Sequence, residues 1–180
     1  TTGEASTLDD EEHVETVRFC VEVVGGRVPV IGGAGSNDTR HGVGLTRAVE
    51  ATGVDAILSV TPYYNKTSQK GLIAHYTAIA NSVKVPIVLY NVPGRTGQNI
   101  TPESLVELAK IDNIVSLKDA TGNFGQAVDN LRLLGDRLDI YSGNDDTIIP
   151  LMSLGAKGVI SVLANIAPKA TAEMTHAWLD

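Results

Sequence analysis

Residues 114–122 read Ile-Val-Ser-Leu-Lys-Asp-Ala-Thr-Gly, a short apolar run followed by two charged residues and a turn. The apolar residues are nearly continuous instead of alternating with polar ones, which is typical of a parallel strand covered on both faces. The sequence therefore predicts a buried strand at Ile114–Leu117 that carries Lys118 at its carboxyl end.

Five similar runs rich in Val, Ile and Leu lie before and after this one. They are Val28–Ile31, Ala56–Val60, Pro86–Tyr90, Leu138–Tyr141 and Gly158–Val162. The segments between them have helical periodicity, with apolar faces expected at Val14, Val17, Val21 and Val24, at Leu72, Ile73, Tyr76 and Ile79, and at Phe124, Ala127, Val128 and Leu131. Thr101-Pro102-Glu103 is a typical helix start, because it combines an N-cap, a proline and an acid in the first turn.

Alternating strands and helices predict a parallel sheet with covering helices, either an open doubly wound sheet or a closed barrel. Polar residues follow the carboxyl end of nearly every predicted strand, whereas an open sheet would concentrate its site at one switch point. We therefore expect an α/β fold of the (β/α)8 TIM-barrel type. The residues at these strand ends are Tyr63, Tyr64, Tyr90, Asn91, Lys118, Asp119, Gly143 and Asn144.

Composition narrows the class of partner. The formal charge is −7 and the pI is about 5.0, so no basic surface is expected to bind nucleic acid or an anionic membrane. No apolar run is long enough to span a membrane, and the first residues are polar and acidic. The single Cys20, expected near the apolar face of the first helix, cannot form an internal disulfide, which favours a reducing compartment such as the cytoplasm.

Lys118 is the strongest candidate for chemistry. Partial burial at the top of a barrel would lower its pKa and provide the neutral amine that attacks a ketone to form an imine. The alternative is a strand-end lysine that reaches solvent or an ion pair. Asp119 should point to the opposite side of the strand, which makes it a poor ion-pair partner for Lys118.

Three other segments could contribute to the same site. Tyr90 ends the preceding predicted strand, so its phenol could shuttle protons beside Lys118 or simply pack in the rim. Arg95 lies in the following loop and could hold a carboxylate, or be an ordinary surface arginine. The turn Thr1-Thr2-Gly3 could bind a carboxylate through its amides and hydroxyls, although Thr-Gly pairs are common in turns.

Several motifs do not indicate a cofactor or a metal. Gly32-Gly33-Ala34-Gly35 follows a predicted strand, but Asp38 occupies the third glycine position of a dinucleotide-binding fingerprint. Asn144, Asp145 and Asp146 are interpreted as the cap of a helix near Thr147, not as a magnesium site. The four histidines have no ligand spacing. We therefore expect neither a cofactor nor a metal.

Five segments together resemble the 4-hydroxy-tetrahydrodipicolinate synthases, within the pyruvate-aldolase superfamily that includes N-acetylneuraminate lyase. They are Thr1–Glu4, Thr61–Asn65, Leu89–Gly97, Leu117–Gly122 and Gly158–Ser161. The resemblance implies that Lys118 forms an imine with pyruvate, whose enamine attacks aspartate-4-semialdehyde on the route to diaminopimelate and lysine. It also implies a cytoplasmic dimer or tetramer without metal or cofactor.

The resemblance also assigns roles to individual residues. Tyr90, Thr1 and Tyr64 would form a proton relay, with Tyr64 reaching into the site of a neighbouring subunit. Pyruvate and the semialdehyde would be bound by Thr2, by Arg95 and by the main chain around Gly143 and Ile160.

This chain departs from the family pattern in three ways. Residues 1–180 are expected to form a single, partial barrel with six of the eight strands, lacking two strands before Thr1 and helices after Asp180. Asp119 stands where many relatives carry Glu. Where some relatives bind inhibitory lysine, His13, Asn37 and Tyr63 fit the pattern but Ala5, Asp10 and His41 do not, so we expect weak inhibition.

Two alternative functions remain open at this point. One is a sister aldolase of the N-acetylneuraminate lyase or keto-deoxy sugar acid type, which would use the same lysine chemistry. Arg95 distinguishes the synthase from this sister aldolase, since an arginine suits an aldehyde that carries a carboxylate better than it suits a polyol. The other is an inactive, truncated module, against which the intact set of Lys118, Tyr90, Tyr64 and Arg95 argues.

Overall fold

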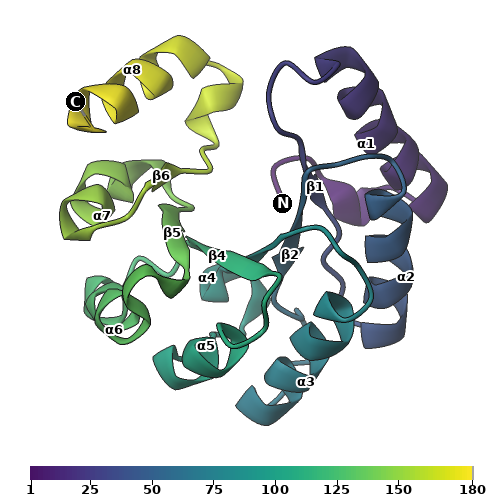
Figure 1. Cartoon of the computed structure of the whole chain (residues 1–180), viewed down its shortest axis with the longest axis horizontal. Coiled ribbons are helices and arrows are strands. Elements are labelled where there is room, and N and C mark those ends of the chain that lie inside the picture. The colour runs from purple at the N-terminus through teal and green to yellow at the C-terminus, as the bar shows by residue number, and fades with distance from the viewer. Residues whose placement is uncertain (180) are drawn as a thin grey trace.

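The computed structural model describes residues 1–179 and contains one parallel sheet with the strand order β1-β2-β3-β4-β5-β6. In Figure 1 the sheet is curved, and helices α1, α2, α3, α5, α6 and α7 lie around its outer side. This arrangement confirms the predicted α/β barrel class for the six strands present. The strands are β1 (Ile31–Gly33), β2 (Ala56–Val60), β3 (Ile87–Asn91), β4 (Ile114–Asp119), β5 (Asp139–Ser142) and β6 (Gly158–Val159).

The helices alternate with the strands as the periodicity predicts. They are α1 (Asp10–Val24), α2 (Thr39–Glu50), α3 (Gln69–Ala80), α4 (Pro93–Thr96), α5 (Pro102–Leu108), α6 (Phe124–Leu134), α7 (Ile148–Leu154) and α8 (Pro168–Leu179). The predicted helix start at Thr101 is confirmed, because its hydroxyl accepts a hydrogen bond from the amide of Ser104. None of the helices in residues 1–179 is long and apolar enough to cross a membrane.

The main core lies between the outer face of the sheet and the covering helices. Ile57, Leu89, Leu117 and Ile140 come from successive strands and are almost completely buried. They pack in one cluster with helix residues such as Leu105. Burying an aliphatic side chain of this size contributes about 1.5–3 kcal/mol, so this layer holds the strands at fixed spacing.

Two strand boundaries differ from the sequence prediction by three residues, and the others differ by two residues at most. The first strand begins at Ile31 instead of Val28, because Pro29 has no amide to donate and the amide of Val30 bonds the side chain of Asp55. The last strand ends at Val159 instead of Val162, although the amide of Ile160 still donates to the carbonyl of Ser142.

Three further expectations were wrong. Cys20 is exposed, since α1 turns that side to solvent. Phe124 and Val128 are also substantially exposed, because only the face of α6 that carries Ala127 and Leu134 meets the core. No side chain of residues 144–146 caps α7; Asp145 instead accepts hydrogen bonds from the loop that follows β6.

Gly35 permits a close approach that fixes the end of β1 against β2. A methyl group at Gly35 would lie 2.6 Å from the backbone nitrogen of Val60 and 2.5 Å from its Cγ1. A methyl group at Gly33 would have no atom within 4 Å. We expect Gly35→Ala to lower the free energy of unfolding by about 1–3 kcal/mol, and Gly33→Ala to change it by less than about 0.5 kcal/mol. Urea denaturation of both variants tests this, and equal effects would contradict it.

Candidate active site

Lys118 and Tyr90 lie side by side at the carboxyl ends of two neighbouring strands. They are register partners in the parallel pair of β3 and β4, and the lysine Nζ lies 4.2 Å from the centre of the tyrosine ring. Only 6% of each residue is exposed. The predicted proximity of these two residues is therefore confirmed, and the lysine is enclosed within the fold.

Burial lowers the pKa of Lys118 below its ordinary value of 10.5, because the ammonium loses hydration. The carboxylate of Asp145 acts in the opposite direction, but its effect is the smaller of the two. The face of the Tyr90 ring also attracts the charged form. The net effect is a lowered pKa, so Lys118 loses its proton more readily than an exposed lysine does. The neutral amine is the form that attacks a carbonyl carbon.

A cavity of about 440 Å³ opens beside Tyr90, and we call it the Tyr90 cavity. Its wall includes Thr1, Tyr63, Tyr90, Arg95 and Thr96. Lys118 contacts the tyrosine ring that forms part of this wall. The cavity thus brings together a phenol, a hydroxyl and a guanidinium from three separate segments of the chain, beside an amine of lowered pKa.

Only three of the eight predicted site residues, Thr1, Tyr90 and Arg95, line the Tyr90 cavity among the described residues. Of the other five, which are Lys118, Gly143, Ile160, Tyr64 and Thr2, the last two are exposed. Tyr64 is 91% exposed and has a φ of 72°, a left-handed conformation that non-glycine residues rarely adopt. Thr2 is exposed in the turn in which the amide of Glu4 donates to the carbonyl of Thr1. In a single chain, therefore, the side chain of Tyr64 is open to solvent.

The amides of Gly143 and Ile160 are already bonded to other strands, which leaves only their carbonyl oxygens available to a ligand. The amide of Gly143 donates to the carbonyl of Asp119, and that of Ile160 donates to Ser142. Gly143 also leaves room for the lysine: a methyl group there would lie 2.8 Å from the Cβ of Ala120 and 3.1 Å from the Cε of Lys118. A side chain at this position would therefore force Ala120 or Lys118 to shift.

Asp145 is the residue that sequence reasoning missed. Its carboxylate accepts hydrogen bonds from the hydroxyl of Ser161 and, at 2.9 Å, from the amide of Leu163. These bonds connect the loop after β5 to the loop after β6, which carries Ile160. The only sign of this role in the sequence is that Asp145 lies two residues after Gly143. From the sequence, Asp145 is instead interpreted as part of a helix cap.

Asp119 does not form an ion pair with Lys118 in the part of the chain that the structure describes, as predicted. Its Oδ1 accepts a hydrogen bond from the amide of Thr121 at 2.8 Å, while its buried Oδ2 has no partner among the described residues. Burial raises the pKa of this carboxyl, and the bonds to Thr121 offset only part of the effect.

Replacing the buried lysine should stabilise the fold in a pH-dependent way. Since the pKa of Lys118 is lowered on folding, the unfolded chain binds more protons between the folded value and 10.5, and the free energy of unfolding rises with pH across that window. We expect Lys118→Met to gain about 1 kcal/mol near neutral pH, and the gain to shrink as the pH approaches 10.5.

Urea denaturation at neutral and alkaline pH measures the pH dependence of the Lys118→Met gain, with the exposed Lys157→Met as the control. A loss of stability that is the same at both pH values would contradict the expected cost of the buried ammonium.

Comparison with known proteins assigns this arrangement to a family. The model of the dihydrodipicolinate synthetase family matches residues 1–180. A 4-hydroxy-tetrahydrodipicolinate synthase of Acetivibrio thermocellus is 56% identical over 180 residues, which cover all of this chain and 61% of that protein.

Solved structures agree with the sequence comparison. A chloride-inhibited dihydrodipicolinate synthase of Acinetobacter baumannii complexed with pyruvate has a TM-score of 0.96 at 49% identity, over 99% of this chain and 61% of that one. The synthase of Aquifex aeolicus has a TM-score of 0.97 at 41% identity, with the same coverage. This chain thus spans about 61% of the length of the relatives it matches. With its lysine, tyrosine and arginine in the arrangement described, the chain belongs to the dihydrodipicolinate synthetase family.

Proposed function

We propose that the protein that carries this chain condenses pyruvate with aspartate-4-semialdehyde to give 4-hydroxy-tetrahydrodipicolinate. The observation that supports this most strongly is the contact between Lys118, whose pKa burial lowers, and the ring of Tyr90 at the wall of a cavity that also holds Arg95. Membership of the family and relatives named 4-hydroxy-tetrahydrodipicolinate synthase support the same reaction.

The amine of Lys118 attacks the ketone carbon of pyruvate, and loss of one water gives the imine. Removal of a proton from the methyl group then gives the enamine, whose carbon attacks the aldehyde of the second substrate. The amino group of that substrate attacks the imine carbon, which closes the ring and releases the lysine amine. Each step moves a proton, and Tyr90 is the phenol placed beside the lysine to accept and return it.

The two substrates carry carboxylates, and the cavity offers matching groups. Arg95 lies at the cavity wall in α4, the short helix after β3, and we assign it to the carboxylate of the semialdehyde. Thr2 and the turn around it would hold the carboxylate of pyruvate, with Thr1 continuing the relay from Tyr90. The carbonyl oxygens of Gly143 and Ile160 would complete the pocket.

Self-association forms part of the proposal. The exposed, strained Tyr64 would complete the relay of a neighbouring subunit, which requires at least a dimer. A shallow apolar groove between α6 and α7, lined by residues that include Phe124, Val128 and Leu154, offers a second surface for a tetramer. The six strands of the chain would form part of a single eight-stranded barrel in a cytoplasmic enzyme.

Arg95 also separates this proposal from the sister aldolases, because a polyol aldehyde has no carboxylate for it to bind.

Inhibition by lysine should be weak. Asp10 and His41 both lie in the cavity wall. Asp10 carries the only carboxylate among the described residues that line the cavity, and His41 already contacts both of its oxygens.

Removing the guanidinium of Arg95 should weaken the binding of aspartate-4-semialdehyde far more than the binding of pyruvate. We expect Arg95→Ala to raise the KM for aspartate-4-semialdehyde roughly 10- to 100-fold, since a charge-assisted hydrogen bond contributes about 1.5–3 kcal/mol, and to change the KM for pyruvate less than about threefold. Steady-state kinetics of the full-length protein tests this, with Arg132→Ala on the outer helix α6 as the control. Equal turnover of a polyol aldehyde by the unsubstituted protein would contradict the assignment.

A further inference from the structure

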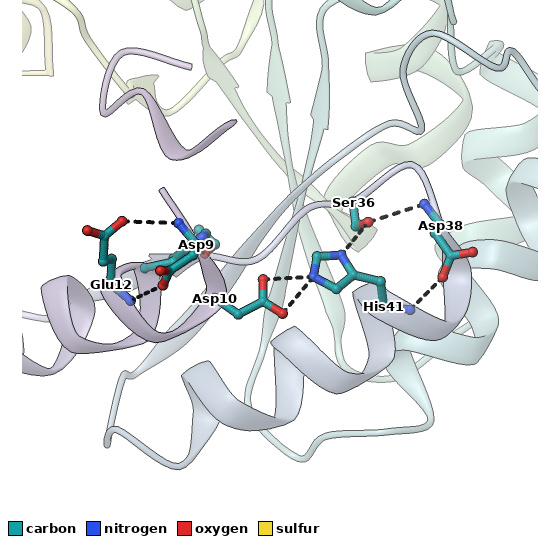
Figure 2. Close-up of polar contacts among 8 residues, drawn as sticks. Asp9, Asp10, Glu12, Ser36, Asp38 and His41 are labelled. Carbon is teal, nitrogen blue, oxygen red and sulfur yellow. Dashed lines mark hydrogen bonds and ion pairs between the residues drawn. The ribbon is translucent and has the colours of Figure 1, made fainter. Parts of the chain in front are cut away.

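A polar cluster connects the first turns of α1 and α2 (Figure 2). Two of its residues, Asp10 and His41, line the Tyr90 cavity. The Nε2 of His41 lies 2.9 and 3.0 Å from the two carboxylate oxygens of Asp10, which is the first residue of α1. The Nδ1 of the same ring lies 2.8 Å from the hydroxyl of Ser36. Both nitrogens of the imidazole therefore have a partner, and the ring is held in one orientation.

The order aspartate, histidine, serine resembles the set of groups that activates a serine nucleophile. Ser36 is only 2% exposed and is not in the cavity wall, whereas Asp10 and His41 are. Its hydroxyl oxygen also accepts a hydrogen bond from the amide of Asp38 at 3.2 Å. A substrate in the cavity cannot reach this oxygen, so the cluster is not a nucleophilic site.

The contact anchors the segment that precedes α1. In the described chain, the hydrogen bonds of residues 1–9 are all made to residues within 1–13, including the reciprocal capping bonds of Asp9 and Glu12. No residue of α1 is fully buried. The side-chain bonds that connect this part of the chain to the sheet and α2 are those from Asp10 to His41 and from His13 to the carbonyl of Gly33 at 2.7 Å.

The anchored segment forms one wall of the Tyr90 cavity. Thr1, Ala5, Ser6 and Leu8 line it from this side, and Tyr90 and Arg95 line it from the other. A shift of α1 relative to α2 would therefore move the turn at Thr1 relative to Tyr90. This wall is held by the side-chain contacts of His41 and His13, together with the apolar contacts of Val14, Val17 and Val21 with the core.

We propose that Asp10 and His41 are positioning residues that hold the turn Thr1–Gly3 in register with Tyr90 and Lys118. The proposal rests on the function proposed above. The side chains of the pair are 68% and 45% exposed, so its contribution to stability is small, about 0–1 kcal/mol. Its effect is on geometry, and a misplacement of about 1 Å can reduce a rate as much as 100-fold.

The test compares Asp10→Asn, His41→Gln and the exchanged pair Asp10→His with His41→Asp in the full-length protein. Arg18→Gln serves as the control, because it removes an exposed charge from α1 whose ion pair lies within the helix. We expect kcat/KM for pyruvate to fall roughly 5- to 20-fold in each single variant, with the KM for aspartate-4-semialdehyde changed less than about twofold. Melting temperatures should shift by less than about 4 °C.

The exchanged pair should recover kcat/KM to within about threefold of the unsubstituted protein, since the contact is rebuilt with its partners reversed. Unchanged pyruvate kinetics in both single variants, or equal losses for both substrates without recovery in the exchanged pair, would overturn the positioning role alone. Failure of the unsubstituted protein to form any pyruvate adduct would instead refute the proposed function and the positioning role together.

Discussion

The site depends on the burial of one ammonium group at the carboxyl end of β4. Lys118 follows an apolar strand, is enclosed against the ring of Tyr90, and has its pKa lowered by the loss of hydration. Such a group is costly to bury, and the surrounding structure must be rigid enough to hold it there. The clusters of Val, Ile and Leu between sheet and helices supply that rigidity, because strands packed on both faces cannot shift independently.

Close backbone approach is the second requirement, and small residues provide it at the points of contact. Gly35 lets the end of β1 approach β2, and Gly143 leaves room for the lysine side chain. The parallel register then determines which residues meet, since the carboxyl ends of all six strands lie at one edge. Short segments follow β3, β5 and β6 at that edge, and they carry Arg95, Asp145 and Ile160 respectively.

Much of this arrangement could be predicted from the sequence, and the part that could not has a physical reason. Continuous apolar runs predict buried strands, and chain order predicts their neighbours, so the contact of Tyr90 with Lys118 was foreseeable. Asp145 and the pair of Asp10 and His41 were not, because their partners lie 16 to 31 residues away in loops and helix ends. Periodicity carries no information about such contacts. The exposed positions of Phe124 and Cys20 were missed because a helical apolar face is wider than the strip that meets the core.

The most direct measurement of the central claim is borohydride reduction of the full-length protein in the presence of pyruvate, followed by peptide mass spectrometry. Reduction converts an imine into a stable secondary amine, so the site of attachment is retained through digestion. The account predicts a pyruvate-derived adduct on the peptide that contains Lys118, and none in the Lys118→Met variant. A folded protein that gives no adduct, or an adduct on a different lysine, would contradict it.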